Sequence, residues 1–246
     1  LFTIGISAYD CTGCGSCAEV CPARNKALNM VMAESIIDEE QSKFDYLLNN
    51  FKENRVSESA DNVRNSQFKQ PLLEFSGACP GCGETPYAKL VTQLFGSRMY
   101  IANATGCSSI WGCSAPSTPY TVNKEGKGPA WSNSLFEDNA EFGYGMAIAV
   151  KARRQELKSC AERLTQDSRL KESAIAWLDN MEDAELSEKM GKKLVDACLA
   201  FNDSEDIKYL IENQDMLAKP SMWIFGGDGW AYDIGYGGLD HVLASG

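Results

Sequence analysis

Four cysteines near the start of the chain constrain its fold and chemistry more than any other feature. Cys11, Cys14, Cys17 and Cys21 follow the spacing C-x2-C-x2-C-x3-C, and Pro22 comes directly after the last of them. This spacing is typical of two-cluster iron–sulfur proteins, in which three thiolates bind one cluster and the fourth binds its neighbour. A zinc knuckle is the alternative, but zinc sites usually place a long spacer between two cysteine pairs. We therefore predict [4Fe-4S] ligands here.

The second cluster would require a matching cysteine run, and the 246 residues contain none. We expect that run to lie before Leu1, which would make this chain part of a longer protein. The chain also ends at Gly246, soon after a predicted buried strand. Further strands of the same sheet are therefore expected from missing chain or from a partner.

A second group of cysteines lies in the middle of the chain. Cys79 and Cys82 form a CxxC pair, and Cys107 follows a predicted strand. A CxxC pair alone also fits a redox dithiol or half of a zinc site. The three thiolates could hold one more cluster, whose fourth ligand would be either Cys113 or a residue beyond Gly246.

Composition and charge exclude several classes of protein. The formal net charge is −11, which argues against a nucleic-acid partner or an anionic membrane surface. No apolar run approaches the roughly 20 residues that a membrane span needs. The ten cysteines cluster at metal-ligand spacings rather than as a secreted disulfide framework, so we expect a reducing compartment such as the cytoplasm. Cys160 and Cys198 lie in helical patterns and are predicted to be buried core residues.

Strand and helix patterns predict an α/β domain. Residues 2–6, 99–102 and 222–225 read as strands, and residues 147–214 show helical spacing of apolar residues. Strands separated by helices indicate a parallel sheet flanked by helices. The expected organisation is a ferredoxin-like α+β segment over 1–30, a linker over 31–70 and a truncated second domain over 71–246.

A glycine-rich turn follows the last predicted strand. Gly226, Gly227, Asp228, Gly229 and Trp230 stand between that strand and a helical pattern. Backbone N–H groups at such a position can hold a diphosphate, and the Asp228 carboxylate suits Mg²⁺. An ordinary strand-to-helix turn is the competing interpretation. The single histidine, His241, is expected to be a packed or surface residue.

Several longer segments together resemble the pyruvate:ferredoxin oxidoreductase family of thiamine diphosphate enzymes. The resemblance covers nearly the whole chain and is carried by YDCTGCG at 9–15, SGACPGCGETPY at 76–87, ATGCSSIWG at 104–112, WSNSLFEDNAEFG at 131–143 and GDGWAYDIG at 227–235. It implies that the first cysteine run belongs to a ferredoxin-like insert with two [4Fe-4S] clusters. It also implies that the second domain binds thiamine diphosphate.

The resemblance further assigns the second cysteine group and the glycine-rich turn. It implies that Cys79, Cys82 and Cys107 hold the third cluster, beside the thiamine, with a fourth ligand outside this chain and not Cys113. Glu84 and Cys107 would line the thiamine pocket. The segment Gly227, Asp228, Gly229 and Trp230 would hold the diphosphate, with Asp228 on Mg²⁺.

The implied reaction is oxidative decarboxylation of pyruvate to acetyl-coenzyme A and carbon dioxide. Electrons would pass through the clusters to ferredoxin or flavodoxin, and the remainder of the same enzyme, as a homodimer, would supply the other contacts. The fragment alone is expected to be inactive. A ferredoxin-like electron-transfer module without its own catalysis is the alternative, and a zinc-stapled interaction protein is a third class.

Overall fold

The chain forms two compact units, which are described separately. A computed structural model describes residues 4–50, 62–113, 118–201, 203–232 and 235–246. Unit 1 runs from Leu1 to Leu94 and unit 2 from Phe95 to Gly246, so the division falls inside a helix, later in the chain than the expected start of the second domain.

Unit 1 is built from short helices and turns. Its helices are α1 (Ser16–Glu19), the 3-10 helix Ala33–Ser35, α2 (Ile37–Asn50), α3 (Val63–Ser66) and most of α4 (Thr85–Phe95). Leu72 and Leu73 are buried, and the Leu72 backbone N–H donates to Thr92 Oγ1 of α4 at 3.1 Å. The segment around Leu72 is therefore fixed to α4.

The predicted strand at residues 2–6 is not formed over the part that the structure describes. Residues 4–6 have no regular secondary structure, and residues 2 and 3 lie outside the described residues. A strand needs a neighbour to satisfy its backbone groups, and the only paired strands among the described residues belong to unit 2. The strand pattern of residues 2–6 was therefore not enough by itself to specify a strand.

Unit 2 contains a parallel three-stranded sheet with the order β2-β1-β3. Its strands are β1 (Met99–Ala104), β2 (Ala130–Ser134) and β3 (Ser221–Phe225). Strands β1 and β3 confirm the predictions at 99–102 and 222–225. The middle strand of the sheet, β1, is the most buried, as its continuous apolar residues suggest. Strand β2 was not predicted, because its sequence AWSNS has no apolar run.

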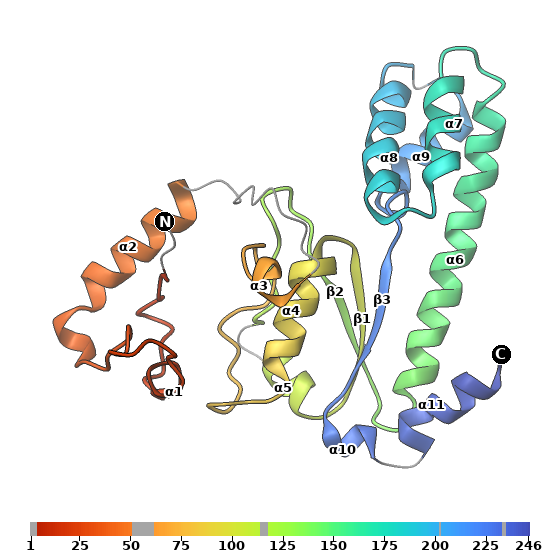
Figure 1. Cartoon of the computed structure of the whole chain (residues 1–246). Helices are drawn as coiled ribbons and strands as arrows, with labels where there is room; N and C mark the ends of the chain where they lie inside the picture. The colour runs from red at the N-terminus through yellow and green to blue at the C-terminus, as the bar shows by residue number, and fades with distance from the viewer. Residues whose placement is uncertain (1–3, 51–61, 114–117, 202, 233–234) are drawn as a thin grey trace. The chain divides into compact units, whose positions relative to one another are not determined.

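Two helical connections leave the sheet in opposite directions. Helix α5 (Cys107–Cys113) precedes β2, whereas the long helix α6 (Asn139–Leu164) begins the connection from β2 back across β1 to β3. In Figure 1 these two helices lie on opposite sides of the sheet. Right-handed crossovers require this arrangement when the strand order reverses. The reversal makes the carboxyl ends of β1 and β3 a topological switch point.

A helical subdomain stands at the amino ends of the strands (Figure 1). It contains the second half of α6 and the helices α7 (Lys171–Asn180), α8 (Ala184–Leu199) and α9 (Glu205–Glu212). Leu157, Trp177, Leu194 and Leu210 are fully buried in its core. The helices confirm the helical spacing predicted for residues 147–214.

The buried face of α8 includes small residues and leaves one of its leucines exposed. Leu186 is 41% exposed, whereas its small neighbours Ser187 and Gly191 are buried. A Cβ atom at Gly191 would lie only 2.8 Å from Leu217 Cβ. Small residues let the backbone of α8 approach its neighbours closely, so packing rather than hydrophobicity alone selected this face.

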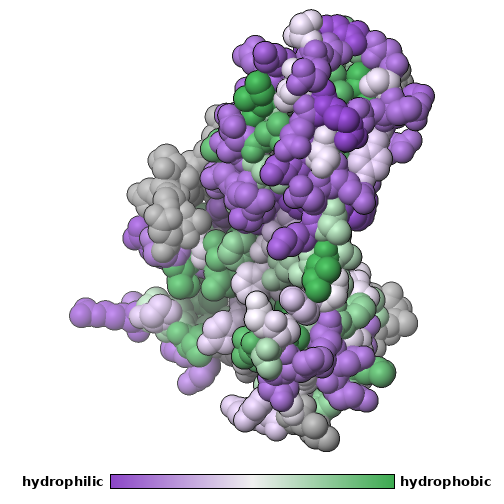
Figure 2. Space-filling model, turned by 90° about the vertical axis from the view of Figure 1, so that its right-hand side faces the viewer, coloured by the Kyte–Doolittle hydropathy of each residue, from purple (hydrophilic) through white to green (hydrophobic). Residues whose placement is uncertain are grey.

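The remaining elements of unit 2 are short. They are the 3-10 helices Gly96–Arg98 and Gln214–Met216, and the helices α10 (Asp228–Ala231) and α11 (Gly235–Ala244) after β3. Figure 2 shows mainly hydrophilic residues over the helical subdomain and more hydrophobic residues toward the opposite end. Exposed apolar side chains of α6 and α11 include Phe142, Ile148 and Leu243. No helix in the described ranges has the length and apolar character of a membrane span.

Candidate functional site

Two predicted binding loops of unit 2 meet at the topological switch point. Thr105, Gly106 and Cys107 follow β1, and Gly226 and Gly227 follow β3. The strands are parallel neighbours, with Asn103 opposite Phe225, so both loops leave the same edge of the sheet. Ligands of open α/β sheets bind at this edge, where the strand order reverses. The tertiary structure therefore brings together two segments that are about 120 residues apart in the sequence.

Cys107 occupies the first position of α5. The Gly106 carbonyl accepts the N–H of Ile110 at 3.1 Å, and the Ser109 hydroxyl accepts the Gly106 N–H at 2.9 Å. The Ser109 side chain thereby satisfies the backbone N–H of the residue before the helix, which corresponds to one half of a capping box. Cys107 is exposed.

The glycine-rich turn forms a short helix directly after β3. Gly227 is the N-cap of α10, and its carbonyl accepts the N–H of Ala231 at 3.0 Å. Asp228 begins the helix and is exposed. The predicted strand, turn and helix are therefore confirmed. Trp230 packs against Gly226 inside the turn, and its indole Nε1 is buried with no hydrogen-bond partner among the described residues.

A group of polar side chains at the same edge was missed in the sequence. Asn103 Nδ2 donates to Asn133 Oδ1 at 3.1 Å, and Asn133 Nδ2 donates to Thr105 Oγ1 at 3.0 Å. Thr105 Oγ1 in turn donates to the Ser134 carbonyl at 2.8 Å. Asn103 is fully buried. The available signal in the sequence was Asn103 near the end of the otherwise apolar strand β1. The neighbouring strand β2 is polar.

The first cysteine run forms an exposed series of turns in unit 1. Cys11, Cys14 and Cys17 are exposed, and Cys21 is partly buried. Gly13 and Gly15 adopt φ angles of 70° and 77°, a region that other residues rarely enter. These turns make the short spacing between the thiols sterically possible.

Hydrogen bonds favour the thiolate form of two of these cysteines. Cys14 Sγ lies 3.5 Å from the Ser16 hydroxyl oxygen, and this hydroxyl lowers the pKa of Cys14. The backbone N–H groups of Ala23 and Ala27 lower the pKa of Cys21, with Ala27 N at 3.2 Å from the sulfur. Metal-binding cysteines are deprotonated, so the local bonding suits the predicted ligand role.

The CxxC pair of unit 1 precedes α4. The Cys82 N–H donates to the Cys79 carbonyl at 3.0 Å, and the Glu84 carbonyl accepts from Ala88 at 3.2 Å at the start of the helix. Burial raises the pKa of Cys82, but hydrogen bonds from the Thr85 and Glu84 backbone outweigh burial and lower it overall. Cys79 is exposed, and Glu84 is partly buried.

The cysteines predicted to be structural lie in a different environment. Cys160 and Cys198 are fully buried in the helical subdomain, and burial raises the pKa of each thiol to about 11. The Cys160 thiol donates to the Asp206 carbonyl at 3.1 Å. All ten cysteines are free, so no thiol is withdrawn from metal binding by a disulfide.

The single histidine is an exposed residue of α11, with Nδ1 of His241 3.0 Å from Glu141 Oε1.

The predicted metal ligands are not gathered around one point. Among the described residues, no three Cys, His, Asp or Glu side chains form a group that could hold a metal ion. Cys79 and Cys82 belong to unit 1 and Cys107 to unit 2, so their common cluster stays a prediction. Cys113 ends the helix that Cys107 begins, and its exclusion as the fourth ligand stays a prediction. The soft, exposed thiols fit iron–sulfur ligation.

One cleft of unit 2 lies away from these loops. Its volume is about 880 Å³, and it lies between the amino ends of the strands and α8. Charges of both signs line it, including Arg98, Glu188 and Lys192, and Lys127 forms an ion pair with Glu188. The paired charges give the cleft no clear ligand preference, so the switch point is the better candidate site.

Comparison with known proteins gives three findings. The 4Fe-4S binding domain matches residues 4–24. The whole chain is 54% identical to part of the pyruvate:ferredoxin oxidoreductase of Moorella thermoacetica and 51% identical to part of the pyruvate-flavodoxin oxidoreductase of Enterobacter agglomerans. It is also 47% identical to 14% of the mitochondrial pyruvate dehydrogenase [NADP(+)] of Euglena gracilis. The chain spans 22% of the length of the first two relatives.

These similarities confirm the family resemblance found in the sequence. They extend over 100% of the chain, including both cysteine groups and the glycine-rich turn. They also agree with an iron–sulfur segment at the start of the chain.

Proposed function

We propose that this chain, which is homologous over its whole length to a segment of pyruvate:ferredoxin and pyruvate-flavodoxin oxidoreductases, carries the electron path and part of the thiamine diphosphate site of such an enzyme. The complete enzyme converts pyruvate and coenzyme A to acetyl-coenzyme A and carbon dioxide. Ferredoxin or flavodoxin is its electron acceptor. The rest of the longer chain, as a homodimer in a reducing compartment, completes the site.

The observation that carries this proposal is the meeting of the two loops at the switch point. Cys107 begins α5 after β1, and Gly227 caps α10 after the adjacent strand β3. A diphosphate held by the backbone of Gly227 to Trp230 would lie beside a cluster ligand. Asp228 is exposed in the same turn and is available to Mg²⁺.

The cysteines divide into three roles under this proposal. Cys79, Cys82 and Cys107 hold the cluster nearest the thiamine, and Glu84 contributes to the thiamine pocket. Elsewhere in unit 1, Cys11, Cys14 and Cys17 hold one ferredoxin-like cluster and Cys21 holds its neighbour. Lowered thiol pKa values at Cys14, Cys21 and Cys82 support these roles.

The chemistry explains why the two kinds of cofactor belong together. Thiamine diphosphate supplies the electron sink that decarboxylation of a 2-oxo acid requires. The oxidation releases two electrons, and the iron–sulfur clusters that the cysteines would hold would supply one-electron acceptors for them. The residues of this chain bind the diphosphate and its metal, and hold the clusters at the exit.

The full-length enzyme, purified without oxygen, tests the proposal. We expect a brown protein that reduces ferredoxin or flavodoxin only when pyruvate, coenzyme A and thiamine diphosphate are all present. A protein that carries iron and exchanges electrons without binding thiamine diphosphate would instead be a simple electron-transfer module. A colourless, zinc-containing preparation would exclude both functions.

A further inference from the structure

One buried side chain of unit 2 contacts all three strands at their carboxyl ends. Asn139 is the first residue of α6 and has no exposed surface. Its Nδ2 donates to the Phe225 carbonyl of β3 at 2.8 Å and to the Ala102 carbonyl of β1 at 3.4 Å. Its Oδ1 accepts the Ser134 hydroxyl of β2 at 2.8 Å. One amide thus joins the three strand ends.

The close approach of α6 to the sheet makes this contact possible. Gly143 lies one turn after Asn139, on the same face of the helix. A Cβ atom at Gly143 would lie 2.6 Å from Ile224 Cγ1 and 3.1 Å from Ala102 Cβ. Any larger residue would push α6 away from β1 and β3, and the Asn139 amide would lose its reach.

The chemistry of the contact selects asparagine. Both strand carbonyls require a donor, and the Ser134 hydroxyl requires an acceptor; one amide supplies both. An aspartate in its usual ionised form has nearly the same shape but no donor. It would place a negative charge against two carbonyl oxygens in a buried site.

The position of Asn139 matters because of the strand order. Strands β1 and β3 are neighbours, but no direct connection joins them, because α5 leads from β1 to β2 and α6 begins the connection from β2 to β3. The backbone ladder between β1 and β3 runs to Asn103 and Phe225. Beyond it, the separation of the two following loops depends on side-chain contacts. Phe225 directly precedes Gly226, and Ala102 lies in β1, four residues before Gly106.

We propose that Asn139 is a positioning residue that fixes the distance between the cluster-ligand loop after β1 and the diphosphate loop after β3. This inference rests on the proposed function, because it requires both cofactors at the switch point. Asn139 itself touches neither cofactor. Loss of the Asn139 amide should loosen the diphosphate loop, because this amide donates to the carbonyl of Phe225, the residue of β3 that directly precedes the loop.

The test compares Asn139→Asp with the wild-type full-length enzyme. Thiamine diphosphate affinity is measured by titration at fixed Mg²⁺, together with iron content and the thermal midpoint. We expect affinity to fall at least about tenfold, because a buried hydrogen bond is replaced by a repulsion. Iron content should remain at the wild-type value, because no cysteine is changed.

Leu194→Ala is the matched control for stability. Leu194 is fully buried in the helical subdomain, at the opposite end of the strands, so its truncation destabilises unit 2 without touching the switch point. The control should retain wild-type cofactor affinity despite an equal or larger fall in the thermal midpoint. An equal loss of affinity in the control would overturn the positioning role.

A second variant keeps the test decisive if Asn139→Asp does not fold. Gly143→Ala retains the amide but moves α6 at the same place, so it should weaken thiamine diphosphate binding in the same way. If folded Asn139→Asp or Gly143→Ala binds thiamine diphosphate with wild-type affinity, the positioning role is wrong, whereas the proposed function still stands. Failure of the wild-type enzyme to bind thiamine diphosphate would instead overturn the proposed function.

Discussion

At the residue scale, the cysteines of this chain occupy two chemically different environments. Those at the short spacings are exposed or partly buried, and hydrogen bonds lower the pKa of Cys14, Cys21 and Cys82. Cys160 and Cys198 are fully buried, and burial raises their pKa to about 11. Reactive and structural thiols are therefore separated by solvent access and by local donors.

Asp228 should contribute to cofactor binding through the metal. Asp228→Ala removes a hard carboxylate from the predicted Mg²⁺ site, so thiamine diphosphate affinity in the full-length enzyme should fall at least about tenfold. Titration at several Mg²⁺ concentrations measures this. Asp179→Ala, an equal charge change on an exposed residue of α7, is the control. Unchanged affinity in Asp228→Ala would remove Asp228 from the metal site.

The buried thiol of Cys160 should make stability depend on alkaline pH. Its pKa in the folded state, about 11, lies above the ordinary value of 9.0. Between these values the unfolded thiol is ionised while the folded thiol keeps its proton. The contribution of the protonated Cys160 thiol to the stability of the folded state is therefore fully present below about pH 9. It is lost as the pH rises through about 11.

Cys160→Ala provides the measurement for this pH effect. At pH 8 the variant should unfold at a lower temperature than the wild type, because it loses a buried sulfur atom and its hydrogen bond to the Asp206 carbonyl. The difference should shrink at pH 10.5, since only the wild type then loses stability through this thiol. A constant difference at both pH values would contradict the assignment.

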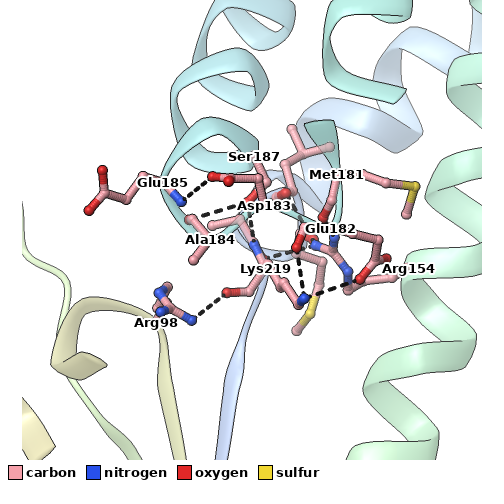
Figure 3. A network of polar contacts seen from close by, with 12 residues as sticks. Arg98, Arg154, Met181, Glu182, Asp183, Ala184, Glu185, Ser187 and Lys219 are labelled. Carbon is pink, nitrogen blue, oxygen red and sulfur yellow. Dashed lines mark hydrogen bonds and ion pairs between the residues drawn. The ribbon is translucent and has the colours of Figure 1, made fainter. Parts of the chain in front are cut away.

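At the scale of elements, a buried arginine joins the helical subdomain to the sheet (Figure 3). Arg154 of α6 is 6% exposed, and its Nη1 donates to the Met216 and Ala218 carbonyls at 2.6 Å and 2.9 Å. Its Nη2 donates to the Met181 carbonyl. These carbonyls lie in the turn before α8 and in the segment leading to β3, so one side chain satisfies backbone groups from two connections.

Arg154→Met should therefore destabilise unit 2 strongly. It leaves several buried carbonyls without a donor, and we expect the free energy of unfolding to fall by about 3 kcal/mol. Urea unfolding of the full-length protein, followed by hydrogen exchange in α6 to α9, measures this. Arg153→Met is the control, because Arg153 is exposed and should change the stability by less than about 0.5 kcal/mol. Similar losses in both variants would contradict the role of Arg154.

At the scale of the whole molecule, the predicted ligands of the thiamine-proximal cluster are divided between the two units. Two of its ligands, Cys79 and Cys82, lie in unit 1, and the third, Cys107, lies in unit 2. Metal binding contributes to folding free energy when ligands come from separate parts of a chain.

Iron analysis of the full-length enzyme tests that cluster. If it contains three [4Fe-4S] clusters, Cys79→Ser should remove about one third of the iron, because one cluster loses a thiolate ligand. Cys113→Ser is the matched control, since Cys113 is also exposed but is not expected to be a ligand. Iron loss in Cys113→Ser would instead support Cys113 as the fourth ligand, and full iron in Cys79→Ser would exclude Cys79.

The sequence by itself determined which chemistry this chain can carry. Three features of the sequence are local: the cysteine spacings, the apolar runs of β1 and β3, and the glycine-rich turn. The spacings indicate the type of ligand, and the runs and the turn indicate the backbone geometry of their own segments. Long-range packing decided the rest. Only the tertiary structure paired the polar strand β2 with β1, placed the small residue Gly191 on the buried face of α8 and excluded a paired strand at residues 4–6. It also brought Cys107, Asp228 and Asn139 to one edge of the sheet, because strand order depends on which elements pack together and not on their separate sequences.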